Sequence, residues 1–147
     1  MRDKAALAPP DLARTWEQVF PGTPDQLCPA RAALRAFLDG CPATDDVALL
    51  VSEMCANAIA HSASGRPGGT FTVRVGHAPG DHVRAEVQDA GSEWHGDIAR
   101  SASHLHGLYL LLALAAACGT DATGRSRTVW FRLDERDGQV PAELGRP

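Results

Sequence analysis

The chain has 147 residues, 44% of them apolar and 22% charged, which is typical of one globular domain with a single hydrophobic core. Its formal net charge of -4 gives no basic footprint, so nucleic acid is not an expected partner. No apolar run is long enough to cross a bilayer, and the first residues lack the apolar segment of a secretion signal. We therefore expect a cytoplasmic protein without a membrane span.

The cysteines are scattered along the chain. Cys28, Cys41, Cys55 and Cys118 form no C-x-x-C pair, and three of them fall in predicted helices, where a cysteine usually acts as a small buried apolar residue. We expect structural thiols ahead of disulfides or a metal site, in a reducing compartment.

The N-terminal third predicts a strand followed by a helix. The segment RTWEQVFPG, 14–22, favours a strand that ends at its Pro-Gly pair. Residues 23–40 carry helix signals, with Thr23 as the expected N-cap and a glycine at the end. Pro29 is expected to be absorbed in the first two turns or to move the helix start by a few residues.

The central segment predicts a second helix and a hairpin. Residues 42–62 favour a helix with Thr44 as its cap and two aspartates in the first turn. Residues 70–77 and 82–91 alternate between apolar and polar side chains, and the APGD between them is a turn.

The C-terminal segment predicts a loop, a helix and a last strand. Residues 91–107 are polar and irregular, 108–118 favour a third helix ended by Gly119, and 126–133 favour a strand. The elements do not alternate as in a doubly wound parallel sheet. The order predicts an α+β fold with a mixed, mostly antiparallel sheet and helices on one face.

One domain accounts for the predicted elements. We assign it to residues 14–134, between a flexible lead-in over 1–13 and a flexible tail over 135–147. No internal repeat is visible in the sequence.

The second predicted helix keeps a row of polar residues. Glu53, Asn57 and His61 are spaced four apart, and at about 100° per residue they lie along the margin of an apolar stripe. The stripe consists of Val47, Leu50, Val51, Met54 and Ala58. Polar groups at that border are costly unless they face water, a ligand or a metal. An amide oxygen there could ligate Mg²⁺ while the carboxylate orients or deprotonates a nucleophile; alternatively, backbone groups satisfy Asn57 and His61.

Two further features lie downstream of this helix. Asp89 follows a strand directly and could accept a hydrogen bond from an exocyclic amine, while Gly91 permits close approach of a ring or a backbone; the alternative is a plain turn. Gly107 opens a helix whose free N–H groups could meet phosphate oxygens. The polar loop between them is placed as a lid over a ligand would be.

Together these motifs resemble the GHKL, or Bergerat-fold, ATPase superfamily. The matching features are E-x-x-x-N-A-x-x-H on a helix, a hairpin, D-x-G, a variable loop, G-L-x-L-L and a closing RTVWF strand, from Trp16 to Leu133. Within the superfamily the chain is most similar to the small stand-alone branch of bacterial anti-sigma factors that are also serine kinases. FPGTP, LLVSEMCANAIAHS, GGTFTVRV and TVWFRL carry that similarity. The resemblance implies a two-layer α/β sandwich that binds ATP and Mg²⁺.

The resemblance also implies roles for residues of the second helix. Asn57 would hold the Mg²⁺ that bridges the phosphates. Glu53 would act as general base, on a partner serine in a kinase or on water in an ATPase. His61 matches the histidine that ends the family's first motif, and a structural role is expected for it.

The remaining implied roles concern the nucleotide itself. Asp89 would bind the adenine amino group, and Gly91 would let the base lie close. Gly107 and the N–H of Leu108 would cradle phosphate at the helix start. Thr128 would support the adenine end from the last strand.

The chain departs from the family pattern in the lid. Leu105 stands where the first glycine of a Gly-x-Gly is common, and its bulk could crowd the phosphates. No proline follows Gly91 within a few residues, and Arg100 is the basic residue within the lid. These departures favour ATP binding over efficient phosphoryl transfer.

The resemblance implies protein partners and leaves alternatives open. A sigma factor and a small, STAS-like anti-sigma-antagonist with a phosphorylated serine are the implied partners, and homodimerisation is compatible with this branch. A protein-interaction module with a decayed ATP pocket is the main alternative. A third alternative is a metal enzyme that uses His95, His104 and His106, although no cysteine or carboxylate pattern completes that site.

Overall fold

The computed structural model describes residues 13–91 and 106–135, without the side chains of 106–109. The flexible lead-in, the polar loop and the flexible tail expected from the sequence lie almost entirely outside these residues. The described part contains β1 (Arg14–Pro21), η2 (Pro24–Gln26), α1 (Leu27–Phe37), α2 (Thr44–His61), η3 (Ala63–Gly65), β2 (Thr70–Ala78), β3 (His82–Asp89), α4 (His106–Leu114), β4 (Ala117–Thr123) and β5 (Ser126–Asp134).

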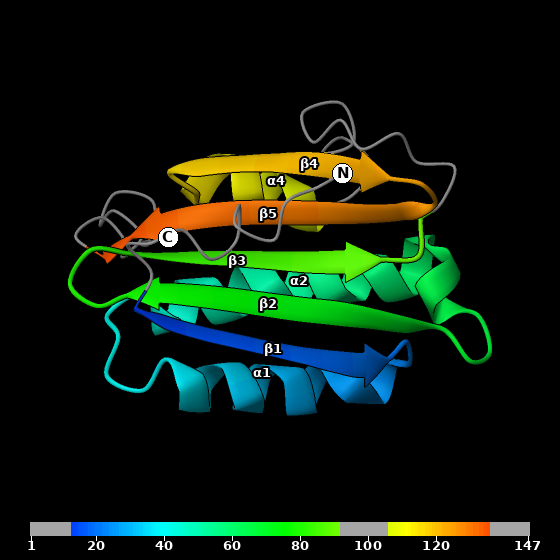
Figure 1. Ribbon diagram of the computed structural model, residues 1–147, viewed down its shortest axis with the longest axis horizontal. Helices are drawn as coiled ribbons and strands as arrows, with labels where there is room; N and C mark the ends of the chain where they lie inside the picture. Colours follow the sequence, from blue (N-terminus) through cyan, green and yellow to red (C-terminus); the bar gives the residue numbers. More distant parts are fainter. Residues whose placement is uncertain (1–12, 92–105, 136–147) are drawn as a thin grey trace.

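The strands form one sheet with the order β1-β2-β3-β5-β4. Each neighbouring pair in this order is antiparallel. Figure 1 shows the three helices on one face of the sheet, with α2 behind β2 and β3. The predicted α+β architecture with helices on one face is therefore confirmed, and the sheet is antiparallel throughout the described residues.

Alternation along the strands decides which face receives the helices. On β2, Phe71, Val73 and Val75 are buried, while the residues between them are partly exposed or small. On β5 the apolar residues Val129 and Phe131 repeat the pattern. Because side chains alternate between the two faces of a strand, these residues share the face that α2 covers.

The apolar stripe of α2 supplies the other half of the core. Val47, Leu50, Val51, Met54 and Ala58 are each at most 3% exposed, as the sequence pattern predicts. Cys55 lies in the same core, and burial raises the pKa of its thiol to about 12. All four cysteines are free thiols: Cys41 and Cys55 are buried and Cys118 is partly buried, whereas Cys28 is exposed and is not the buried apolar residue that the sequence predicts.

The first helix begins later than predicted, and its predicted cap is wrong. Thr23 lies before the 3-10 turn η2 and makes no capping bond to the backbone; its hydroxyl donates to the Asp25 carboxylate instead. The α-helix proper begins at Leu27. Pro29 then falls in the first turn, where its missing N–H costs no intrahelical hydrogen bond.

The predicted cap of the second helix is also wrong, by one position. Thr44 is the first helical residue, and Ala43 occupies the cap position. The Thr44 hydroxyl donates to the carbonyl oxygens of Leu38 at 2.9 Å and Cys41 at 2.7 Å. These bonds tie the end of α1 to the start of α2.

Strand β4 is not predicted from the sequence. The sequence pattern extends the third helix to Cys118, but α4 ends at Leu114, and Cys118 and Gly119 lie in β4. A β-carbon on Gly119 would lie 2.8 Å from Nε1 of Trp130, so this glycine makes room for the indole of the neighbouring strand rather than ending a helix. Pairing with β5 overrides the helix propensity of alanine here.

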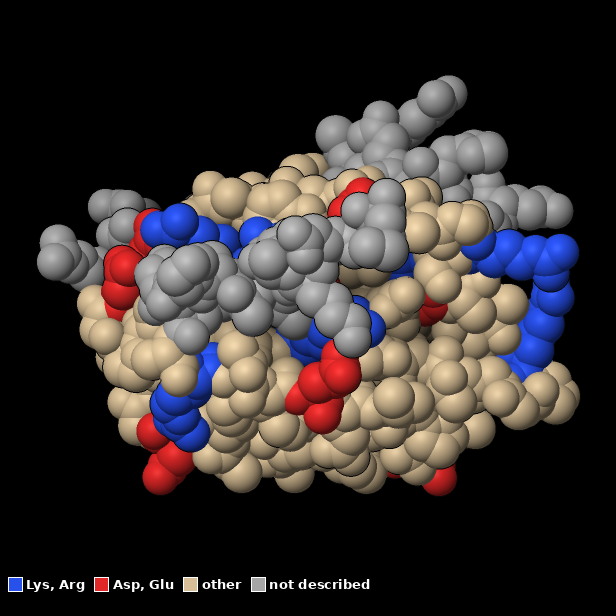
Figure 2. Space-filling model, viewed as in Figure 1, with Lys and Arg blue, Asp and Glu red and all other residues tan. Residues whose placement is uncertain are grey.

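The face of the sheet away from the helices carries ion pairs. Arg74 on β2 donates to the carboxylates of Glu17 on β1 and of Glu86 on β3, and the Arg84 guanidinium lies 4.3 Å from the Trp130 ring centroid. Figure 2 shows basic and acidic side chains next to one another on this face. Opposite charges are thus interspersed here rather than gathered into a patch of one sign.

Within the described residues, no helix combines the length and the apolar composition that crossing a bilayer would require.

We predict that Gly22→Ala destabilises the fold at the junction of β1 and η3. A β-carbon on Gly22 would lie 1.7 Å from the Ser64 carbonyl oxygen, so the backbone must move, at a cost of about 3 kcal/mol in the free energy of unfolding. Urea unfolding measures this change. Gly40→Ala is the control, because Gly40 has φ +82° and no atom near the added carbon; its cost should be about 1 kcal/mol. Equal costs for the two variants would contradict the steric explanation.

Candidate functional site

The end of α2 and the end of β3 meet through η3. The Ala63 N–H donates to the Gly91 carbonyl at 2.9 Å, and the Ala90 N–H donates to Oγ of Ser64 at 2.9 Å. Asn57 lies one turn before the end of α2. Figure 1 shows that α2 and β3 end at the same end of the sheet, so Asn57, one turn before the end of α2, lies at the end of the sheet where β3 ends at Asp89.

The polar row of α2 spans two environments. Glu53 and Asn57 are partly buried, whereas His61 is exposed. Nδ2 of Asn57 is buried and has no hydrogen-bond partner among the described residues. An unsatisfied buried polar atom costs roughly 1–3 kcal/mol of stability. A ligand that accepts a hydrogen bond from Nδ2 would remove this cost.

Asp89 is held by two donors. The Gly91 N–H donates to Oδ1 at 2.7 Å, and Nη2 of Arg127 donates to Oδ2 at 3.2 Å. Asp89 is 7% exposed and Arg127 6%, so this is a buried ion pair between β3 and β5. Desolvation lowers the pKa of the Arg127 guanidinium, and the charge of Asp89 opposes that change.

Position 91 requires a glycine because the backbone of Arg125 packs against it. Its φ is +84°, and a β-carbon there would lie 1.7 Å from the Arg125 carbonyl oxygen, in the turn between β4 and β5. The sequence predicts that this glycine permits close approach of a ring or a backbone. In the structure, the group that approaches is the backbone of Arg125.

The strand register places Arg127, not Thr128, beside Asp89. Asp89 pairs with Arg127 and Gln88 pairs with Thr128, so Thr128 lies on the opposite face of the sheet from Asp89. Sequence reasoning missed Arg127. The signal was present, because Arg127 has the same parity along its strand as the buried Val129.

Gly107 and Leu108 lie in the first turn of α4. Backbone N–H groups in a first helical turn have no intrahelical acceptor, and α4 packs beside α2. The predicted phosphate-binding backbone is therefore at a helix start, as expected. Arg100, Leu105 and two of the three loop histidines, His95 and His104, lie outside the described residues, as does the side chain of His106.

The described residues fit a nucleotide and Mg²⁺. The amide group of Asn57 offers both a donor without a partner and an oxygen of the type that Mg²⁺ ligates. The Asp89 carboxylate has roughly four acceptor positions, of which the Gly91 N–H and Arg127 use two. An exocyclic amine can therefore still donate to Asp89 while Arg127 stays in place.

We predict that Arg127→Met lowers the free energy of unfolding by about 3 kcal/mol, because it leaves the Asp89 carboxylate buried without its counter-ion. Adding Asp89→Asn should recover more than half of this loss, since the amide oxygen still accepts from the Gly91 N–H. Arg132→Met is the matched control on the same strand, because its partner Asp134 is partly exposed; it should cost less than about 1 kcal/mol. Denaturant unfolding of the four proteins measures these values, and no recovery in the double variant would contradict the assignment.

Comparison with known proteins places the fold in a family. A search of curated protein sequences finds no match. A crystal structure of the RsbU and RsbW domains of Rv1364c from Mycobacterium tuberculosis superposes with a TM-score of 0.64 at 21% sequence identity, covering 82% of this chain and 32% of that chain. This chain thus spans about a third of the length of that protein, and the likeness shows the fold. Residues 20–133 match the histidine kinase-like ATPase domain family, and the chain belongs to that family.

Proposed function

We propose that this protein is an ATP-binding regulator of the anti-sigma type that transfers the γ-phosphoryl group of Mg-ATP to a serine or threonine of a small anti-sigma-antagonist protein. Membership in an ATPase-domain family implies ATP as the ligand. The observation that carries the proposal is the buried amide nitrogen Nδ2 of Asn57, which has no hydrogen-bond partner among the described residues, at the end of the sheet where the buried Asp89 lies. The motif resemblance to anti-sigma serine kinases supplies the class of partner, including a sigma factor.

The helix side of the site would bind the phosphates and their metal. Asn57 would ligate Mg²⁺ through its amide oxygen. Bound Mg²⁺ supplies charge neutralisation on the phosphate oxygens. Gly107 and Leu108 would donate their backbone N–H groups to phosphate oxygens from the start of α4.

Glu53 would act on the attacking hydroxyl. It lies one turn before Asn57 on α2 and is partly buried. As general base it would accept the proton of a partner hydroxyl while the hydroxyl oxygen bonds to the γ-phosphorus and the bond to the departing ADP oxygen breaks. Positioning by neighbouring groups then accounts for most of the catalysis.

The strand side would bind the base. Asp89 would accept a hydrogen bond from the adenine amino group, and Gly91, packed against the backbone of Arg125, would help to hold that carboxylate through its N–H. Arg127 lies opposite Asp89 in the strand register, and we propose that it orients the Asp89 carboxylate. The support of the adenine end by Thr128, which the resemblance implies, stays a prediction.

We predict that Asn57→Ala removes Mg-dependent ATP binding without loss of stability. The amide makes no described hydrogen bond through Nδ2, so its removal relieves an unsatisfied group while deleting the metal ligand. Calorimetric titration with ATP and Mg²⁺ should show binding by the wild type and affinity at least about 10-fold weaker in the variant, which is a loss of about 1.4 kcal/mol or more.

Ser52→Ala is the control for this experiment. Ser52 lies on α2 and accepts a hydrogen bond from Arg31 on α1, away from the end of β3, and its variant should bind as the wild type does. Undiminished binding by Asn57→Ala would remove Asn57 from the site. An unchanged or higher urea midpoint for Asn57→Ala separates loss of the ligand from loss of the fold.

We predict that Glu53→Gln lowers ATP turnover at least about 100-fold, because a general base typically contributes that much or more. Its affinity for Mg-ATP should change less than about threefold, since the glutamate would act on the nucleophile. Formation of ADP from Mg-ATP measures turnover, and calorimetry measures affinity. Asp45→Asn, at the exposed start of the same helix, is the control. Full turnover in Glu53→Gln would refute the general-base role.

A second candidate function is a protein-interaction module that does not use ATP. The Asp89–Arg127 ion pair favours it, because this carboxylate is already compensated inside the protein. The same calorimetric titration separates the two candidates. Absence of Mg-ATP binding by the folded wild type supports the interaction module and contradicts the kinase.

A further inference from the structure

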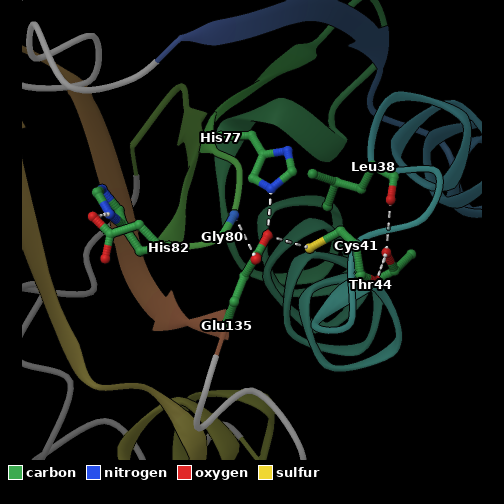
Figure 3. Close-up of polar contacts among 8 residues, drawn as sticks. Leu38, Cys41, Thr44, His77, Gly80, His82 and Glu135 are labelled. Carbon is green, nitrogen blue, oxygen red and sulfur yellow. Dashed lines mark hydrogen bonds and ion pairs between the residues drawn. The ribbon is translucent and has the colours of Figure 1, made fainter.

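Three potential metal ligands meet at the end of the sheet opposite the candidate nucleotide site. They are Cys41 in the connection between α1 and α2, His77 near the end of β2, and Glu135 directly after β5. Figure 3 shows the three side chains pointing toward one another. The strand β3 runs from this end to Asp89 over eight residues, a length of about 23 Å. The cluster is therefore separate from the candidate nucleotide site.

The contacts within the cluster converge on one carboxylate oxygen. Oε1 of Glu135 lies 2.5 Å from Nε2 of His77 and accepts a hydrogen bond from the Cys41 thiol at 3.3 Å. The other carboxylate oxygen accepts from the Gly80 N–H at 2.7 Å. The backbone thus holds Glu135 from one side and leaves Oε1 facing the sulfur and the imidazole.

All three groups are shielded from solvent. Cys41 is 8% exposed, and the side chains of His77 and Glu135 are 5% and 9% exposed. The one sulfur, one nitrogen and one oxygen atom lie within 4.8 Å of one another. Thiolate, imidazole and carboxylate are the three ligand types that zinc prefers, and a thiolate disfavours Mg²⁺ or Ca²⁺.

We propose that Cys41, His77 and Glu135 bind a zinc ion. In a tetrahedral zinc site, bond lengths of about 2.0–2.3 Å place neighbouring ligand atoms roughly 3.3–3.6 Å apart. The sulfur lies 3.3 Å from Oε1, at the lower end of this range, and the His77 nitrogen lies 2.5 Å from it, below the range. Side-chain rotations that move His77 and Glu135 apart open the space for the ion. Zinc takes the Cys41 sulfur as thiolate and releases its proton to solvent, and a water molecule completes the tetrahedron.

The proposed site joins segments that are far apart in the sequence. Glu135 is 94 residues from Cys41 and 58 residues from His77. A bound ion therefore ties the end of β5 to the β2–β3 hairpin and to the start of α2. Zinc should stabilise the folded protein, because it binds the native arrangement and not the unfolded chain.

Zinc titration of the full chain tests the proposal. The protein is reduced, stripped with a chelator and titrated with zinc chloride against a chromophoric competitor. We expect one equivalent to bind, to raise the thermal unfolding midpoint and to be unaffected by excess Mg²⁺ or by ATP. Cobalt in place of zinc should give a thiolate-to-cobalt charge-transfer band together with the intense visible absorption of a tetrahedral ion.

Matched variants identify the ligands. Cys41→Ser should abolish the charge-transfer band and weaken zinc binding at least about 10-fold, and Glu135→Gln should weaken binding while keeping the band. Cys28→Ser, which changes an exposed thiol on α1, should behave as the wild type does. The double variant His104→Ala/His106→Ala should also keep full affinity, which separates this site from a histidine site in the loop.

Three outcomes would overturn the proposal. One is wild-type protein that is folded and binds no stoichiometric zinc, in which case the cluster is a hydrogen-bonded contact alone. Another is zinc binding that survives in Cys41→Ser. The third is a cobalt complex of the wild type without a thiolate charge-transfer band. The cobalt spectrum of the wild type does not depend on whether a variant folds.

Discussion

The backbone of Ser64 is the contact on which the geometry of the candidate site depends. Ser64 is fully buried, and its carbonyl oxygen lies where β-carbons of Gly22 and Gly69 would stand. Its hydroxyl oxygen accepts from the Ala90 N–H. The end of β1, the start of β2 and the end of β3 therefore close on one turn that directly follows α2. Together with the hydrogen bond from the Ala63 N–H to the Gly91 carbonyl, this contact holds the end of the helix that carries Asn57 beside the end of the strand that carries Asp89.

The two sides of the site differ in how well the protein satisfies its own polar groups. On the helix side, a buried atom of Asn57 has no described partner, so the protein carries an unsatisfied group that a ligand can relieve. On the strand side, Asp89 is paired with Arg127 and with the Gly91 N–H, so its charge is compensated without a ligand. A nucleotide would gain free energy mainly from the helix side, while the strand side would act as a preformed acceptor. A buried polar atom without a partner is uncommon in folded proteins, and a ligand that accepts from it is one explanation for its presence.

The sequence predicts the parts of this structure that depend on local pattern. Alternation predicts β2 and β3, the Pro-Gly pair marks the end of β1, and cap signals together with an apolar stripe predict α2. Strand β4 was missed because its alanines favour a helix and only pairing with β5 makes it a strand. The zinc-ligand cluster could not be predicted for a related reason. Glu135 follows the last strand, and nothing in the local sequence brings it to Cys41, 94 residues earlier. The role of Thr128 at the adenine end is predicted from a motif. The face of the sheet on which a side chain lies is decided by the register between β3 and β5, which pairs Asp89 with Arg127.

The alternation of side chains along β5 determines which residues face the helix side at both ends of this strand. Val129, Phe131 and Leu133 are buried against the helices, and their burial requires every second residue of the strand to face the same way. Arg127 therefore faces inward at one end, directly opposite Asp89. Glu135 has the same parity just past the other end, where it reaches His77. A shift of one residue in the pairing with β3 would turn the three apolar side chains away from the core. The register that buries these apolar side chains therefore places Arg127, and not Thr128, next to Asp89. The same register places the Glu135 carboxylate next to Cys41 and His77.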